Sequence, residues 1–73
     1  MTTVNKKETG VNIMLMMDER GISQSELAEI LDVSHAAVNF WICGKRCPSM
    51  NHIVAMTRVF GCDIKDIVVL EEE

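Results

Sequence analysis

The amino-acid sequence predicts a compact all-α domain of five short helices. Apolar residues recur at spacings of three and four along most of the chain, which is the period of an amphipathic helix. Serine or aspartate precedes several of these segments and glycine follows several of them, as in helix caps. No run of alternating apolar and polar residues supports a strand. These three observations favour an all-α fold over one that contains a sheet.

The chain has the length and composition of one small globular domain. Its 73 residues are 48% apolar, which is too hydrophobic for a disordered segment. A domain of this size buries only about 60% of its unfolded surface, so its core is marginal. The apolar runs are too short to span a membrane, and no secretory signal opens the chain. We therefore expect a cytoplasmic protein with no membrane association.

The first two helices are expected at residues 11–20 and 24–31. Gly21 follows the first helix, where glycine commonly ends a helix in the left-handed conformation. Ser23 precedes the second helix, and its spacing to Glu26 is that of a capping box. The inward faces are expected to contain the apolar residues at helical spacing: Ile13, Met16, Met17, Leu27, Ala28 and Leu31.

The third helix is expected at residues 35–43, between Ser34 as its N-cap and Gly44 after its end. One face is apolar and is expected to point inward through Val38, Trp41 and Ile42. The opposite face does not have the Lys, Glu and Gln of a merely solvated helix. Its residues are His35, Ala36, Asn39 and Phe40. We therefore expect this face to have a function beyond solvation.

The last two helices are expected at residues 50–60 and 64–70. Pro48 excludes a helix in the loop before Ser49, which is the expected N-cap of the fourth helix. Asp63 is the expected N-cap of the fifth helix. The inward faces are expected to contain Met50, Ile53, Val54, Thr57, Phe60, Ile64, Ile67 and Val68.

The two ends of the chain are polar. Residues 1–9 are expected to form a flexible N-terminal arm, and residues 71–73 a solvated acidic tail. This division leaves residues 10–70 as the folded domain.

Charge is distributed unevenly along the chain, whose net charge is −4. Residues 11–32 and residues 63–73 each contain five acidic residues and one cation. Residues 33–48, in contrast, contain only the positive charges of Lys45 and Arg46. A basic spot on an acidic body is compatible with DNA binding, although its field is weak.

The three cysteines, Cys43, Cys47 and Cys62, are an odd number, which does not suit a disulfide scaffold. Reduced thiols in a cytosolic protein are the simpler interpretation. Cys43 and Cys47 lack the two-residue spacing of zinc knuckles, so no metal is expected. No serine, histidine and aspartate set is spaced for catalysis, and no glycine-rich phosphate loop occurs. We expect no enzymatic activity, no cofactor and no small-molecule substrate.

The join between the second and third helices is very short, since only Asp32, Val33 and Ser34 separate them. A turn of about three residues makes two helices cross at a large angle, as in a helix-turn-helix unit. Ala28 provides a small side chain at the crossing, and Val33 is an apolar residue that fills the angle. The sequence therefore predicts a helix-turn-helix unit.

One set of residues, each a weak signal alone, forms a specific pattern together: Gln24, Glu26, Leu27, Ala28, Val33, Ser34, Val38, Trp41, Gly44, Lys45 and Pro48. Through this pattern the chain resembles the phage repressor and Cro type of helix-turn-helix regulators, the XRE family. The resemblance covers GISQSELAEILDVSHAAVNFWICGKRCPSMNHIVAMTRVFGCDI and extends through the first helix. It implies a lambda-repressor-like domain that binds double-stranded DNA, with residues 35–43 as the recognition helix in the major groove.

The resemblance also implies which residues face the DNA bases. They are Ser34, His35, Ala36, Asn39 and Phe40, and Cys43 extends their stripe by one turn. Asn39 is suited to a bidentate pair with adenine, and Ala36 and Phe40 are suited to thymine methyl groups. His35 would donate to a guanine acceptor or to a phosphate, or it is simply exposed at the helix start. The second interpretation of Phe40 is that its exposed ring docks on another protein.

Gln24, Lys45 and Arg46 match the positions that hold phosphates in the family, together with the backbone amides of the loop after the recognition helix. Such contacts set register rather than sequence preference. One recognition helix reads only a few base pairs, so a homodimer on a palindromic operator is expected, with half-sites about 34 Å apart. The fourth and fifth helices would form the dimer surface, with Val69 and Leu70 as candidate contacts.

The chain departs from the family pattern in three ways. Asp32 stands where the family usually has glycine in the turn, and Asp tolerates the left-handed conformation better than most residues. Met17 and Ile42 replace a frequent Arg and Glu pair, which indicates an apolar contact in place of an ion pair. The reading face lacks Gln, Arg and Lys, so we expect modest affinity.

A protein-interaction module on the same fold is the alternative hypothesis, because a fold alone does not settle function. The acidic net charge, Asp32 and the apolar surface from Ala36 to Phe40 favour it. The DNA hypothesis is preferred because the phosphate-contact positions are intact. The two hypotheses differ in salt dependence, since DNA affinity falls log-linearly with salt and docking through Phe40 would hardly change.

Overall fold

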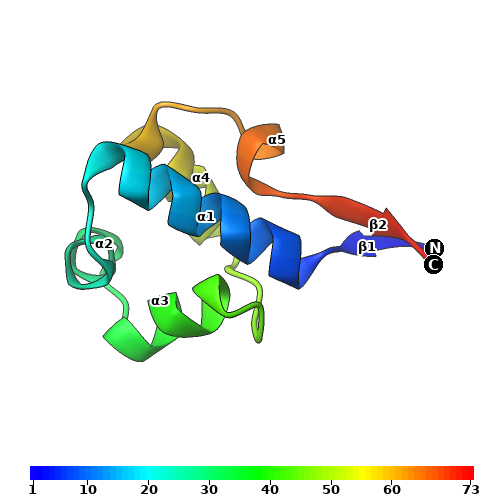
Figure 1. Cartoon of the computed structure of the whole chain (residues 1–73), viewed down its shortest axis with the longest axis horizontal. Helices are drawn as coiled ribbons and strands as arrows, with labels where there is room; N and C mark the ends of the chain where they lie inside the picture. Colours follow the sequence, from blue (N-terminus) through cyan, green and yellow to red (C-terminus); the bar gives the residue numbers. More distant parts are fainter.

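The computed structural model describes all of residues 1–73 and contains five helices between two short terminal strands (Figure 1). In chain order the elements are β1 (Thr2–Val4), α1 (Lys6–Arg20), α2 (Gln24–Leu31), α3 (His35–Ile42), α4 (Met50–Phe60), α5 (Ile64–Ile67) and β2 (Leu70–Glu72). The five predicted helices are confirmed, and the two strands are an addition. None of the helices is both long enough and apolar enough to cross a membrane.

The hydrophobic core forms around α1, which crosses the middle of the helical body and packs against α3, α4 and α5 (Figure 1). Every helix contributes at least one buried side chain to a single cluster of Ile13, Met17, Leu27, Ala28, Val38, Trp41, Ile53, Met56, Phe60 and Ile67. Met16, Leu31 and Ile42 are partly buried against this cluster. The inward faces predicted for the first three helices are therefore confirmed.

The inward face of α4 differs from the prediction. Met50 and Val54, expected inside, are 62% and 44% exposed. Met56, which was not expected inside, is fully buried, and Ile53 and Phe60 are buried as expected. A face through positions 53, 56 and 60 also has three-to-four spacing, so the pattern allowed two faces. Packing against α1, α2 and α5 selected one of them.

The predicted caps are confirmed at α2, α3 and α4. The side chains of Ser23, Ser34 and Ser49 each accept a hydrogen bond from the backbone amide three residues later. Glu26 completes the capping box, because its carboxylate accepts a 3.1 Å bond from the Ser23 amide. These bonds satisfy backbone donors that the first turn of a helix leaves unpaired.

α1 begins at Lys6 rather than at Val11. Asn5 caps the helix, because its Oδ1 accepts a 2.9 Å hydrogen bond from the Glu8 amide. The first turns contain no apolar stripe, since they pack through Gly10. A Cβ at that position would lie 2.8 Å from the carbonyl oxygen of Ile42. Glycine therefore lets α1 touch the end of α3 directly, and no pattern of apolar residues reveals this contact.

α5 is shorter than predicted, because the backbone is already extended at Val68. Ile67 is fully buried, whereas Ile64 is 42% exposed rather than inward. The Val69 amide donates a 3.0 Å hydrogen bond to the buried hydroxyl of Thr9, which ties the segment after α5 to the first turn of α1. This tie directs the chain into β2.

The two chain ends pair as an antiparallel ribbon of β1 and β2, in which Thr3 lies opposite Glu71. Figure 1 shows both termini at the tip of this ribbon, beyond the helical body. The expectation of a flexible arm at residues 1–9 is corrected, because Thr2–Val4 pair with Leu70–Glu72 and α1 begins at Lys6, whereas residues 71–73 are exposed as expected. Strands of three residues at opposite ends of a chain show no alternating pattern long enough to predict them.

Candidate nucleic-acid interface

α2 and α3 form the predicted helix-turn-helix unit. Asp32 adopts the left-handed conformation, with φ 55° and ψ 47°, and is the only residue other than glycine with positive φ. The Val33 amide donates a 3.0 Å hydrogen bond to the Ala28 carbonyl, which closes the end of α2. Ala28 is buried in the core and Val33 packs against it. The left-handed conformation that Asp32 was expected to tolerate is therefore confirmed, and Ala28 and Val33 both lie on the inner side of the unit.

The outer side of α3 is exposed, whereas Val38 and Trp41 on its inner side are buried. Four of the predicted base-reading residues are exposed there: Ser34, His35, Ala36 and Asn39. The Ser34 hydroxyl accepts a 3.1 Å bond from the Ala37 amide and is thereby fixed at the helix start. A cap hydroxyl held in this way keeps its own hydrogen as a donor toward a partner.

Asn39 is oriented by two neighbouring side chains. Its Nδ2 donates to Oε1 of Gln24 at 3.5 Å, and its Oδ1 accepts from the Cys43 thiol at 3.7 Å. Gln24 is the first residue of α2, so the first of these bonds links the two helices of the unit. Both bonds are long and therefore weak, which allows stronger bonds to a base edge to replace them.

Phe40 is half-buried rather than exposed, because Arg46 covers its ring. The guanidinium carbon of Arg46 lies 5.1 Å from the ring centroid, within the range of a cation–π contact. The aromatic surface on which the sequence hypothesis relied is therefore partly occupied by a cation. Contact between Phe40 and a thymine methyl requires Arg46 to move aside toward a phosphate.

Three backbone amides of the loop after α3 donate hydrogen bonds back to that helix. The amides of Lys45 and Arg46 both donate to the Phe40 carbonyl, at 3.0 and 3.3 Å. The Gly44 amide donates to the Trp41 carbonyl at 3.1 Å. These three amides therefore close the end of α3 in the free chain, and the phosphate contacts predicted for the amides of this loop stay a prediction. The side chains of Lys45 and Arg46 remain exposed.

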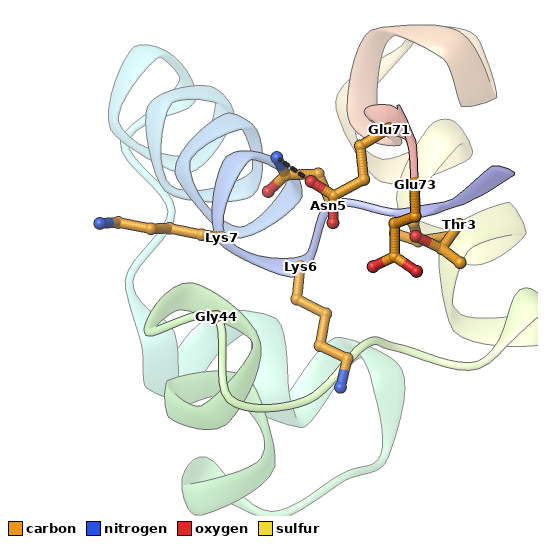
Figure 2. A pocket seen from close by; sticks show the side chains of 8 residues that line it. Thr3, Asn5, Lys6, Lys7, Gly44, Glu71 and Glu73 are labelled. Atoms are coloured by element: carbon orange, nitrogen blue, oxygen red, sulfur yellow. Dashed lines mark hydrogen bonds between the residues drawn. The ribbon is translucent and has the colours of Figure 1, made fainter. Parts of the chain in front are cut away.

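Two further cations lie beside this loop and were missed in the sequence. Lys6 and Lys7 are exposed at the start of α1. A Cβ on Gly44 would lie 2.8 Å from the Cα of Lys7, so the two segments are in direct contact. Both lysines and Gly44 line one hollow together with Glu71 and Glu73, and Figure 2 shows the Lys6 and Lys7 side chains pointing in different directions from the start of α1. The adjacent lysines were the only sequence signal, and nothing in the sequence placed them near Lys45.

Trp41 and the three cysteines are the other side chains that could have chemical roles. Trp41 is 5% exposed, which confirms it as a core residue. The three cysteines are free, and no group of three or more His, Cys, Asp or Glu side chains is placed to hold a metal ion. Burial raises the pKa of the Cys62 thiol, and the charge of Asp66 raises it further. Of the three thiols, that of Cys43 contacts the outer side of α3 through its hydrogen bond to Asn39.

Comparison with solved structures gives the same fold. The restriction-modification controller protein C.AhdI from Aeromonas hydrophila matches with a TM-score of 0.74 at 18% identity, over 82% of this chain and 91% of that one. The clp gene regulator ClgR from C. glutamicum matches with a TM-score of 0.77 at 18% identity, over 89% and 84%. A transcriptional regulator from Listeria innocua matches with a TM-score of 0.81 at 20% identity, over 93% and 64%. No significant match exists among curated proteins.

The helix-turn-helix family model matches residues 13–67, which include both helices of the unit, the turn and the loop after α3. This family consists of transcription regulators that bind DNA, not of enzymes. The match covers most of the chain and agrees with the geometry of the turn. The chain therefore belongs to the Cro/C1-type helix-turn-helix family, also called the XRE family.

Proposed function

We propose that this chain is a sequence-specific, DNA-binding transcriptional regulator of the repressor type, with the recognition helix at residues 35–43 in the major groove. The contact between Asn39 and Gln24 carries this proposal. Asparagine is suited to reading adenine, and the start of α2 is suited to a phosphate contact. Because the two side chains are adjacent, the base contact of Asn39 and the phosphate contact of Gln24 would position each other.

The proposed base contacts come from the outer side of α3. Asn39 pairs with the N6 and N7 edge of adenine through its amide. Ala36 and, once Arg46 has moved, Phe40 contact thymine methyl groups. His35 donates to a guanine acceptor or to a phosphate, and Ser34 donates its hydroxyl hydrogen nearby.

The proposed phosphate contacts come from Gln24, Lys45 and Arg46. They hold the chain in register on the duplex and do not distinguish sequences. The restriction-modification controller and the clp gene regulator have the same fold, which supports a role in gene regulation. We expect this activity where bacterial or phage DNA is found, in the cytoplasm.

The proposed active form is a homodimer on a palindromic operator. A surface hollow of about 500 Å³ opens between α4, α5 and the terminal ribbon, and six of its seven lining residues are apolar. Met50, Ile64 and Leu70 line it and are 62%, 42% and 62% exposed. Of the two residues suggested by the sequence, Leu70 lines this hollow and Val69 is half-buried. A second copy that covers this surface would remove several large apolar side chains from water.

A titration of fluorescent duplexes tests the proposal. Random and then selected duplexes are titrated with the chain by fluorescence anisotropy, between about 50 and 200 mM salt. We expect affinity to fall log-linearly with salt and to be higher for the selected sequence. Sedimentation of the chain with its selected duplex should give two protomers per duplex. Absence of binding to every duplex at the lowest salt would refute DNA binding, and a monomer on the selected duplex would refute the dimer.

Docking on another protein is a second candidate, which the exposed apolar side chains of α4 and α5 favour. Binding through this surface would vary little with salt, because burial of apolar area has no counterion term. The salt series therefore separates the two candidates. Substitution of Leu70 with Ser should weaken a docked protein or a second copy, and it should leave single-site contacts to DNA unchanged.

A further inference from the structure

Two basic segments from distant parts of the chain meet at one corner of the molecule. We define the basic corner as Lys6, Lys7, Lys45 and Arg46, all of which are exposed. It contains four of the seven lysines and arginines in the chain. The backbone of Lys7 touches Gly44, which has a left-handed conformation with φ 74° and directly precedes Lys45 and Arg46. Cationic charge is therefore concentrated here on a chain with net charge −4.

The basic corner lies at the C-terminal end of α3. Gly10 of α1 packs against the carbonyl oxygens of Trp41 and Ile42, so the first turns of α1 are fixed beside the last turn of α3. A duplex that receives the outer side of α3 would therefore extend past Lys45 and Arg46 toward Lys6 and Lys7. A line of cations along this direction suits a sugar-phosphate chain.

Two glutamates, one in β2 and one directly after it, lie beside the lysines of this corner. Glu71 and Glu73 line one hollow with Lys6, Lys7 and Gly44 (Figure 2). The Glu71 carboxylate is held in place, because Asn5 Nδ2 donates to it at 3.1 Å. The pairing of β1 with β2 thus places fixed negative charge where the phosphates would approach.

Glu72 occupies the other face of the ribbon. Successive side chains of a strand point to opposite faces, so Glu72 does not share the hollow of its two neighbours. Its carboxylate instead accepts a hydrogen bond from the hydroxyl of Thr2, the residue opposite it. Glu72 is therefore a control for Glu71 and Glu73. It has the same charge but lies on the opposite face of the ribbon.

We propose that the basic corner binds the DNA backbone and that Glu71 and Glu73 compete with phosphate there, so that β2 and the residue after it limit how tightly the chain holds DNA. This inference rests on the proposed DNA-binding function. The competing charges are exposed, so salt screens them over about 8 to 10 Å. The limit set by β2 is therefore strong at low salt and fades as salt rises.

The test compares single glutamate substitutions in the full chain. Glu71→Gln, Glu72→Gln and Glu73→Gln each remove one charge, and glutamine can still accept the hydrogen bond from Asn5 or Thr2. Affinity for a random duplex is measured by fluorescence anisotropy at several salt concentrations. We expect Glu71→Gln and Glu73→Gln to bind about threefold or more tightly at low salt, and Glu72→Gln to change much less. The double variant Lys6→Gln with Lys7→Gln should weaken binding and lower the salt slope by about one to two contacts.

Thermal unfolding followed by circular dichroism checks that every variant keeps the fold. Equal tightening by all three glutamate variants would attribute the effect to net charge and overturn the role of β2. An unchanged salt slope in the double lysine variant would overturn the role of Lys6 and Lys7. If the wild-type chain binds DNA, but all three glutamate variants tighten binding equally and the double lysine variant keeps the wild-type salt slope, this inference is refuted. The proposed DNA-binding function would then remain intact. Failure of every variant to bind any duplex would refute both.

Discussion

A Cβ atom on Gly10 would lie 2.8 Å from the carbonyl oxygen of Ile42, so α1 and the recognition helix touch through their backbones. This contact sets the end of α3 against the first turns of α1. It therefore fixes the outer side of α3, the proposed reading face, relative to the two lysines at the start of α1. A substitution at Gly10 would disturb both.

Gly10→Ala should destabilise the fold, because the added methyl group meets backbone atoms that cannot rotate away. We expect a loss of about 1–3 kcal/mol in the free energy of unfolding. For a domain of this size each kcal/mol lowers the Tm by roughly 4–8 °C. Gly21→Ala is the control, since its methyl group meets nothing within 4 Å and only the left-handed conformation is strained. Thermal unfolding should show the larger loss for Gly10→Ala, and the reverse order would contradict the contact.

Asn39→Ala should relax base preference at one position of the operator. The loss of a bidentate pair with adenine costs about 1–3 kcal/mol of discrimination. Competition between the selected duplex and duplexes changed at single positions measures this loss. Asn51→Ala, at an exposed position of α4, is the matched control. If Asn39→Ala kept every base preference of the wild type, the reading role of Asn39 would be wrong.

Lys45→Ala should weaken binding to all sequences alike, because a phosphate contact carries no sequence information. The slope of log affinity against log salt should fall in magnitude by about 1, the value expected for the loss of one phosphate contact. Arg58→Ala removes an exposed positive charge from α4 and serves as the control. A change in base preference with an unaltered salt slope would assign Lys45 to base reading instead.

Glu26→Gln should reduce the loss of stability in acid. Hydrogen bonds from the Ser23 backbone amide and then from its hydroxyl lower the pKa of Glu26 below its ordinary value of 4.5. A carboxyl whose pKa is lowered by folding stabilises the fold fully above the unfolded pKa, and this contribution is lost as pH falls through the folded pKa. Urea unfolding at about pH 7 and pH 3 should therefore show a larger drop for the wild type than for Glu26→Gln. Glu29→Gln, in the same helix but outside the capping box, should keep the wild-type drop.

Local features of the sequence determined the bounds of α2 and α4, the start of α3 and the turn between α2 and α3. A serine cap bonds an amide three residues later, and the left-handed Asp32 ends the helix directly before it. Both features therefore depend on residues that are close in the sequence. The outer side of α3 followed from the same local period. The buried face of α4 could not be predicted from this period, because two faces of α4 have helical spacing. Only packing against the neighbouring helices selects one of them.

The sequence by itself therefore determined the helix-turn-helix unit and the exposed residues of its recognition helix, because caps and helical periods are interactions between near neighbours. The tertiary structure alone decided the early start of α1, the terminal ribbon, and the meeting of Lys6 and Lys7 with Lys45 and Arg46. Each of these depends on backbone contact between segments far apart in the chain, at Gly10, at Gly44 and between the two strands. Such contacts use glycine and main-chain hydrogen bonds, which leave no periodic pattern of side chains in the sequence.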